Sequence, residues 1–172
     1  MQKTPKILLF GYGNPGREDD GLGNAFIEFI EPWIKEKKLS NIEVDSNYQL
    51  NIEDSETISD KDIVVFIDAT IEPIDAVILT RVDPSEAKIE FTMHASSPSF
   101  ILDLCNKLYN KNPETYVLRI KGYEWEFKEG LTPKAHSNLL KALDFMKDRI
   151  KDPASFKSFA TSPPSPPSGE KK

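Results

Sequence analysis

The chain has 172 residues, of which 38% are hydrophobic and 29% charged, and its formal net charge is −6 at pH 7. This length suits one domain with its own hydrophobic core, and the composition is typical of a globular protein with a well-solvated surface. The acidic balance argues against nucleic acid, whose binding proteins carry basic patches. Because no apolar run approaches the roughly eighteen residues that cross a bilayer, a membrane is not an expected partner either.

The start of the chain and its cysteine content favour a cytoplasmic protein. The first residues, MQKTPKILLFGYG, lead almost directly into a strand-like run, without the apolar stretch and cleavage site of a secretory signal. The single cysteine, Cys105, cannot form an internal disulfide, which fits a reducing compartment.

Strand-like and helix-like segments alternate along the chain. Short, nearly continuous apolar runs predict strands at 6–10, 41–44, 62–68 and 115–120, with weaker predictions at 77–79 and 88–92. Apolar residues at steps of three and four predict helices over 22–34, from Pro98 to about Leu108, and from Pro133 to about Ile150. Pro32 should kink or end the first helix, since it has no amide hydrogen to donate. This order predicts an α/β fold, a single-domain three-layer α/β/α sandwich with a twisted, mainly parallel sheet flanked by helices.

The last residues differ in composition from the rest of the chain. From Asp152 the sequence reads DPASFKSFATSPPSPPSGEKK, which is dense in proline and serine. Such a segment buries too little apolar surface to offset the entropy lost on ordering. We therefore predict a domain over residues 1–151 and a disordered tail over residues 152–172.

Polar side chains follow three of the predicted strands. Asp20 lies in the loop after strand 6–10, Asp68 ends strand 62–68, and His94 follows strand 88–92. The carboxyl ends of parallel strands meet at one edge of a sheet, where active sites of such folds lie. Two carboxylates and an imidazole suit a divalent ion such as nickel or zinc. From these residues alone, two interpretations remain open: the three side chains form one metal site, or they lie in unrelated loops.

The loop after the first strand permits a second interpretation. Residues 11–16 fit the Gly-x-Gly-x-x-Gly fingerprint of dinucleotide-binding proteins, and Asp45 stands where an acidic ribose ligand could lie. However, the acidic residues 18–20 would repel a pyrophosphate at the start of the helix. For Glu18 and Asp19 the simplest interpretation is capping and dipole compensation of that helix.

Four segments resemble, in order, the motifs of the hydrogenase maturation endopeptidases. They are GYGNPGREDDGLG at 11–23, VVFIDA at 64–69, HASSPSFIL at 94–102 and GYEWEFKEGLTP at 122–133. The resemblance implies an endopeptidase that removes the C-terminal extension of a nickel-loaded hydrogenase large-subunit precursor. It implies nickel binding by Asp20, Asp68 and His94. The nickel would come with the precursor and serve as the recognition element, and another divalent cation could substitute.

The resemblance also implies roles for single residues. Asp20 and Asp68 would be catalytic in a nickel-dependent, aspartic-type or metal-assisted hydrolysis, with one of them accepting a proton. Substrate contacts would fall on Gly13, Asn14, Arg17 and Gln49. Residues 46–51, SNYQLN, stand in place of a Gly-Gly-Thr/Ser turn and are closer to the subgroup that serves bidirectional, soluble-type hydrogenases. A monomer is expected, because the enzyme must dock on its partner.

Two other function classes stay open at this point. The protein could be a dinucleotide-binding oxidoreductase module, or a non-catalytic hydrogenase-assembly chaperone of the same fold. A cysteine-protease pair of Cys105 and His94 is disfavoured, because Cys105 shares an apolar helix face with Ile101 and Leu104. The aromatic and acidic loop around Trp125 is either a solvated loop or part of a substrate-docking rim.

Overall fold

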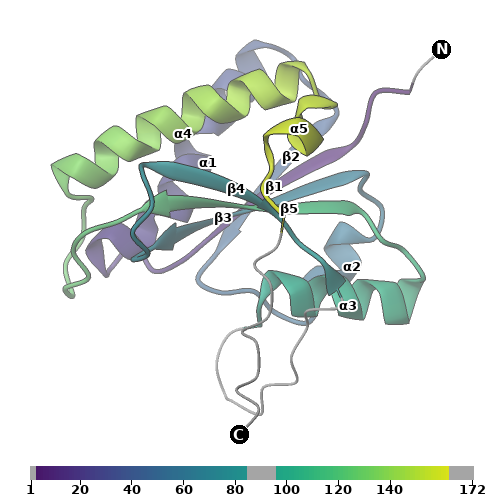
Figure 1. Cartoon of the computed structure of the whole chain (residues 1–172), viewed down its shortest axis with the longest axis horizontal. Helices are drawn as coiled ribbons and strands as arrows, with labels where there is room; N and C mark the ends of the chain where they lie inside the picture. The colour runs from purple at the N-terminus through teal and green to yellow at the C-terminus, as the bar shows by residue number, and fades with distance from the viewer. Residues whose placement is uncertain (1–2, 85–95, 163–172) are drawn as a thin grey trace, which may run out of the picture.

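The computed structural model describes residues 3–84 and 96–162, which form a five-stranded sheet flanked by helices (Figure 1). The strands are β1 (Ile7–Tyr12), β2 (Ile42–Asn47), β3 (Ile63–Thr70), β4 (Val77–Arg81) and β5 (Glu114–Lys121), in the order β2-β1-β3-β5-β4. β2, β1, β3 and β5 run parallel, and β4 pairs with β5 in the antiparallel direction. The sheet is therefore mainly parallel, as predicted.

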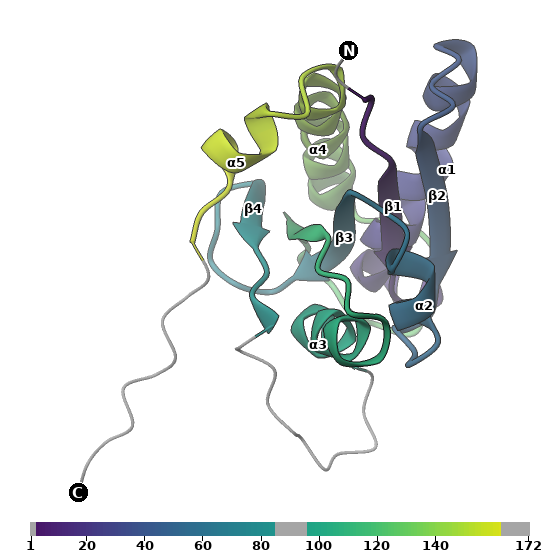
Figure 2. The same cartoon turned by 90° about the vertical axis from the view of Figure 1, so that its right-hand side faces the viewer.

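Helices cover both faces of the sheet. They are the short 3-10 helix η1 (Glu18–Gly21), α1 (Leu22–Glu36), α2 (Asp54–Ile58), α3 (Pro98–Tyr109), α4 (Pro133–Lys151) and α5 (Ser155–Phe159). Figure 2 shows α1 and α4 on one side of the sheet, and α2 and α3 on the other. None of the helices in residues 3–84 and 96–162 is long and apolar enough to cross a membrane.

Each face of the sheet has its own hydrophobic core. Ile7 and Leu9 of β1 point into the core shared with α1 and α4, whereas Leu8 and Phe10 point into the core shared with α2 and α3. A strand that is buried on both faces needs apolar residues at every position, because successive side chains alternate between the faces. This requirement explains the continuous apolar runs in the sequence and confirms the three-layer architecture.

Two local predictions differ from the structure. α1 continues past Pro32 to Glu36, because Pro32 lies on the exposed side while Ile30 and Ile34 remain buried on the other. Losing one helical hydrogen bond there is outweighed by the packing of the apolar face. The helix α2 was not predicted, since its five residues, DSETI, are too few to show a periodicity. Its Ile58 is nevertheless fully buried. The predicted strand at 88–92 lies outside the described residues.

The predicted domain boundary at residue 151 is wrong by about ten residues. Residues 155–159 form α5, and Phe156 is fully buried with its ring stacked on that of Tyr116 at 5.4 Å. Beyond α5, Thr161 pairs with β4, donating to the carbonyl of Leu79 and accepting from the amide of Arg81, both at 2.9 Å. The buried Phe156 ring, the contacts of Arg149 with Ser155 and Phe159, and the pairing of Thr161 hold in place a segment whose average composition favours disorder. The prediction of a disordered tail remains only for residues 163–172, which lie outside the described residues.

Replacing Phe156 with alanine is therefore expected to destabilise the whole fold. Loss of a fully buried phenylalanine costs about 3–5 kcal/mol, which chemical denaturation would measure as a lower unfolding midpoint. Leu108→Ala is the control, because that side chain is 63% exposed and its removal should leave the midpoint unchanged. Equal midpoints for the Phe156 variant and the wild type would show that the segment after residue 151 does not contribute to the fold.

Candidate active site

The glycine loop after β1 brings the start of α1 against the ends of β1 and β3. Gly13 has φ +148°, and a Cβ atom there would lie 2.0 Å from the carbonyl oxygen of Asp20. A Cβ on Gly23 would lie 2.4 Å from the carbonyl oxygen of Ile67 and 2.8 Å from that of Tyr12. Only glycine allows these approaches. The glycine spacing thus places η1, with Asp20, at the carboxyl edge of the sheet beside the end of β3.

Asp20 and Asp68 come together at this edge. The carboxylate of Asp20 accepts a hydrogen bond from the amide of Asn14 at 2.9 Å. Asp68 is close enough for its pKa to respond to the charge of Asp20. Burial raises the pKa of Asp68 to about 6, a hydrogen bond from Tyr12 opposes this rise, and the negative charge of Asp20 adds to it. Arg119 lowers the pKa of Asp68 by a smaller amount.

This pair of carboxylates fits a cation better than either carboxylate would alone. The negative charge of Asp20 makes ionisation of Asp68 more costly, and a positive ion between the two carboxylates would relieve that cost. Within the described ranges, no group of three or more histidine, cysteine, aspartate or glutamate side chains could hold a metal ion. His94, the third predicted ligand, lies outside the described residues. The structure therefore brings together two of the three predicted ligands.

The glycine loop is not arranged as a phosphate cradle. Between Gly13 and Asp20, every amide donates to a protein acceptor, apart from Pro15, which has none. The amide of Gly16, for example, donates to the side chain of Asn14 at 2.8 Å, and that of Gly13 donates to the carbonyl of Asn47 at 3.1 Å. A dinucleotide site needs such amides free to face the pyrophosphate. The loop geometry therefore argues against the dinucleotide interpretation.

Asp19 and Glu18 have a different role from the one predicted. Asp19 is fully buried and accepts four hydrogen bonds from the loop 122–132: from the amides of Tyr123 (2.7 Å), Glu124 (3.1 Å) and Thr132 (2.8 Å) and from the Thr132 hydroxyl (2.8 Å). Glu18 is also buried and accepts from the amide of Glu126 at 3.3 Å. η1 and α1 have no side-chain cap hydrogen bond at their starts. The capping prediction was wrong, and these two acids hold the loop 122–132 instead.

The predicted substrate contacts are spread over this edge. Gly13 and Asn14 lie directly at Asp20. Arg17 points to the loop 122–132, with its guanidinium 5.1 Å from the ring centre of Phe127 and 3.4 Å from the carbonyl of Trp125. Gln49 is exposed in the loop after β2 and donates to the side chain of Asn51 at 3.3 Å. Only Gly13 and Asn14 are thus seen in contact with a predicted catalytic residue.

Sequence reasoning missed Tyr12 and Arg119, the two further side chains whose hydrogen bond or charge reaches Asp68. Asp68 is directly opposite Arg119 in the pairing of β3 with β5. Arg119 lies within an apolar strand run, and Tyr12 falls in the predicted glycine loop although β1 extends to it in the structure, so neither stood out as site chemistry. The strand register was the only signal that could have linked them to Asp68.

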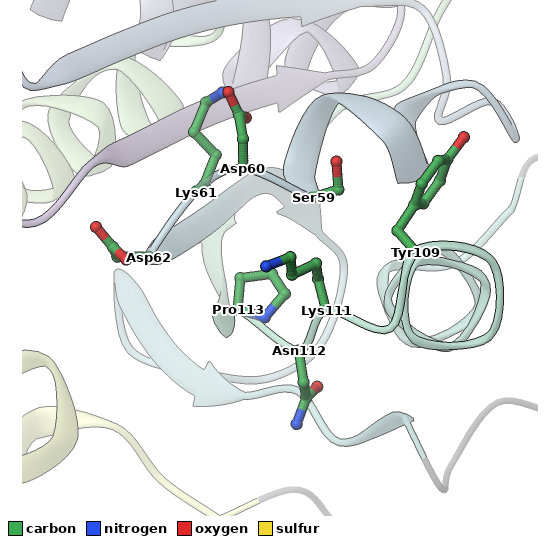
Figure 3. A pocket seen from close by; sticks show the side chains of 8 residues that line it. All are labelled: Ser59, Asp60, Lys61, Asp62, Tyr109, Lys111, Asn112 and Pro113. Atoms are coloured by element: carbon green, nitrogen blue, oxygen red, sulfur yellow. The ribbon is translucent and has the colours of Figure 1, made fainter.

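A pocket of about 660 Å³ lies away from this site (Figure 3). Residues 59–62 and 111–113, together with Tyr109, line it. These segments precede β3 and β5, so the pocket opens at the opposite edge of the sheet from Asp68. Cys105 is also remote from the site chemistry, since it is a free and fully buried thiol of the α3 core, as predicted.

Comparison with solved structures finds the same fold in hydrogenase maturation proteins. The hydrogenase maturating endopeptidase HybD from E. coli aligns with a TM-score of 0.70 and 17% identity over 86% of this chain and 93% of that one. The [NiFe] hydrogenase maturation protease HycI from Thermococcus kodakarensis gives 0.69 and 15%, over 86% and 94%. The endopeptidase HycI from Escherichia coli gives 0.63 and 20%, over 91% and 96%.

Neither the models of known protein families nor the curated protein sequences gave a match. The structural likeness nevertheless agrees with the sequence motifs, and it extends over nearly the full length of the solved proteins. The chain therefore has the α/β fold of the hydrogenase maturation endopeptidases.

Proposed function

We propose that this protein is an endopeptidase that removes the C-terminal extension of a nickel-loaded hydrogenase large-subunit precursor. The observation that carries the proposal is the pairing of Asp20 with Asp68 at the carboxyl edge of a sheet whose solved counterparts are named hydrogenase maturation endopeptidases. The sequence motifs around both aspartates support the same reaction. Asp20 and Asp68 are each only partly buried, so a protein substrate could reach them.

The chain's own residues supply a proton acceptor and an anionic site. Asp68, whose pKa is raised to about 6, is still largely ionised at neutral pH and is a stronger base than an ordinary aspartate. Asp20 is held in place by the amide of Asn14. We assign Asp68 as the base that takes a proton from the attacking water, and Asp20 as the carboxylate that faces the substrate's cation.

Nickel enters this scheme as part of the substrate. Asp20, Asp68 and His94 would provide two oxygen ligands and one nitrogen ligand, a set that suits a divalent ion of this kind. Such an ion polarises a carbonyl and lowers the pKa of bound water. If cleavage requires these residues to bind the substrate's nickel, only precursors that already carry the metal would be cleaved.

The loop 122–132 is proposed as a docking rim beside this site. Its Phe127 is 83% exposed, although the loop is tied down by Asp19 and Glu18 and the Phe127 ring lies against Arg17. A fixed, exposed aromatic ring is the kind of side chain that anchors protein interfaces. Gly13, Asn14 and Gln49 would contact the extended segment being cleaved. The enzyme would act as a monomer in the cytoplasm.

Mass spectrometry of the nickel-loaded precursor after incubation with this protein tests the proposal. The expected result is a precursor shortened by one C-terminal peptide, which is itself recovered. A precursor that is bound but keeps its full mass would instead identify a chaperone. Saturable binding of NAD(P) without any cleavage would identify a dinucleotide-binding module and contradict the geometry of the glycine loop.

A further inference from the structure

Three neighbouring strands place a row of polar residues across the carboxyl edge of the sheet. Gly11 is paired with Ile67 in the parallel β1–β3 register, so Tyr12 follows beside Asp68. In the β3–β5 register, Asp68 is directly opposite Arg119. In-register residues of parallel strands project from the same face of the sheet. Asp68 therefore lies between a tyrosine and an arginine, on the face that α2 and α3 cover.

The ring of Tyr12 is fixed by packing below this row. It meets Phe66 nearly edge-on, at 6.5 Å between ring centres and 79° between ring planes, and Phe66 in turn packs against Phe10 at 5.9 Å. Phe10 and Phe66 are fully buried members of the α2/α3-side core. A ring held in this way can take few orientations. Its hydroxyl is thus kept at the carboxylate of Asp68, with which it forms a hydrogen bond.

We propose that Tyr12 is a positioning residue, whose hydroxyl orients the Asp68 carboxylate for the substrate's metal ion and the attacking water. This inference rests on the proposed endopeptidase function. Hydrogen bonds from the Tyr12 hydroxyl and the Ala69 backbone occupy part of the acceptor capacity of the carboxylate and leave the rest for the substrate. Arg119 lies on the other side of Asp68 and offsets part of the negative charge of its carboxylate. Arg119 is not part of the packing of Tyr12 against Phe66.

The arrangement resembles the support that metal-binding side chains commonly receive. Partners that orient a ligand are usually fixed groups just behind it, and their loss lowers metal affinity or activity by about 10–100-fold. Tyr12 meets this description because its aromatic ring is anchored in the core while its hydroxyl reaches the edge. A phenylalanine at position 12 would keep the anchor and lose only the hydrogen bond.

The variant Tyr12→Phe tests the inference, with Tyr116→Phe as the matched control. Tyr116 is a fully buried tyrosine of β5 that stacks on Phe156, so this control removes a tyrosine hydroxyl that does not contact Asp68. For Tyr12→Phe we expect kcat for trimming the nickel-loaded precursor to fall about 10–100-fold with KM nearly unchanged. The affinity of the precursor-free protein for Co²⁺, followed by visible absorption, should fall in the same range. Both values should stay at the wild-type level in Tyr116→Phe.

The outcomes separate this inference from the function on which it rests. Wild-type kcat in Tyr12→Phe, together with an inactive Asp68→Asn, would overturn the role of Tyr12 and leave the proposed reaction standing. Trimming by Asp68→Asn at the wild-type rate would overturn the proposed reaction itself. A fall in kcat accompanied by an equal loss of folded protein, measured by circular dichroism, would show that the Tyr12 hydroxyl is only structural. If the wild type binds no Co²⁺ without precursor, the kinetic result alone tests the inference. A lower kcat with an unchanged KM supports the positioning role of Tyr12, and an unchanged kcat contradicts it.

Discussion

Replacing Asp68 with asparagine is expected to abolish trimming of the precursor and to make the folded protein more stable at neutral pH. Activity is lost because asparagine cannot accept the proton from water and carries no charge for the substrate's cation. Stability is gained because the fold holds an ionised carboxylate in a place that burial and the charge of Asp20 make unfavourable. Active-site residues often have opposite effects on activity and stability in this way.

The gain in stability should depend on pH. The pKa of Asp68 rises from 3.8 to about 6 on folding, so the folded state binds its proton more tightly than the unfolded state does. The resulting reduction in the free energy of unfolding is absent below pH 3.8, grows as the pH rises to about 6, and reaches its full size above that pH. From the size of the shift the cost is at most about 3 kcal/mol.

Urea denaturation of Asp68→Asn and of the wild type across this pH range measures the difference. The wild type should lose stability relative to the variant between pH 3.8 and about 6, and the difference should be constant at higher pH. A difference that is the same at pH 3.5 and pH 7.5 would contradict the raised pKa, and wild-type trimming by the variant would contradict the role in catalysis.

Replacing Asp19 with alanine should produce the largest loss of stability at this edge. Its carboxylate is fully buried and accepts hydrogen bonds from the backbone amides of Tyr123, Glu124 and Thr132. Alanine would leave these donors without their acceptor, and each unsatisfied buried group costs about 1–3 kcal/mol. With relaxation of the loop, we expect a total of about 3–5 kcal/mol, similar to breaking a buried charged contact.

The loss should be concentrated in the loop 122–132. Hydrogen exchange followed by mass spectrometry should show faster exchange in this loop, while β1 and β3 stay protected. Glu129→Ala is the control, because Glu129 is an exposed acid of the same loop. Unchanged exchange in Asp19→Ala would mean that the loop holds its conformation without Asp19, and the docking-rim proposal would lose its rigid anchor.

The parts of the fold that could be predicted are those in which several consecutive residues are all buried, because such segments are continuously apolar in the sequence. β1 and β3 are buried on both faces along most of their length, so their first residues, ILLF and IVVFI, are all apolar and the strands are visible as continuous runs. The carboxyl edge followed from the parallel order of the strands, and it led to Asp20 and Asp68. α2 and α5 could not be predicted, because each depends on one buried side chain, Ile58 or Phe156, within a short polar segment.

The roles of the acids in the glycine loop could not be predicted for a different reason. Glu18, Asp19 and Asp20 are consecutive and chemically alike, yet two are buried against the loop 122–132 and one reaches Asp68. The partners of Asp19 lie 104 to 113 residues away in the sequence. Only the folded chain shows that Asp19 and Glu18 bond to this loop while Asp20 lies near Asp68.

The most direct test of the central claim compares wild type and Asp20→Asn on the same precursor, with and without nickel, by intact mass spectrometry. Asp20 accepts its hydrogen bond from the amide of Asn14, a contact that asparagine can keep, so the variant should fold normally while losing the charge. We predict release of the C-terminal peptide only by the wild type acting on the nickel-loaded precursor. Release of that peptide by Asp20→Asn at the wild-type rate would show that the chemistry does not take place at this edge of the sheet.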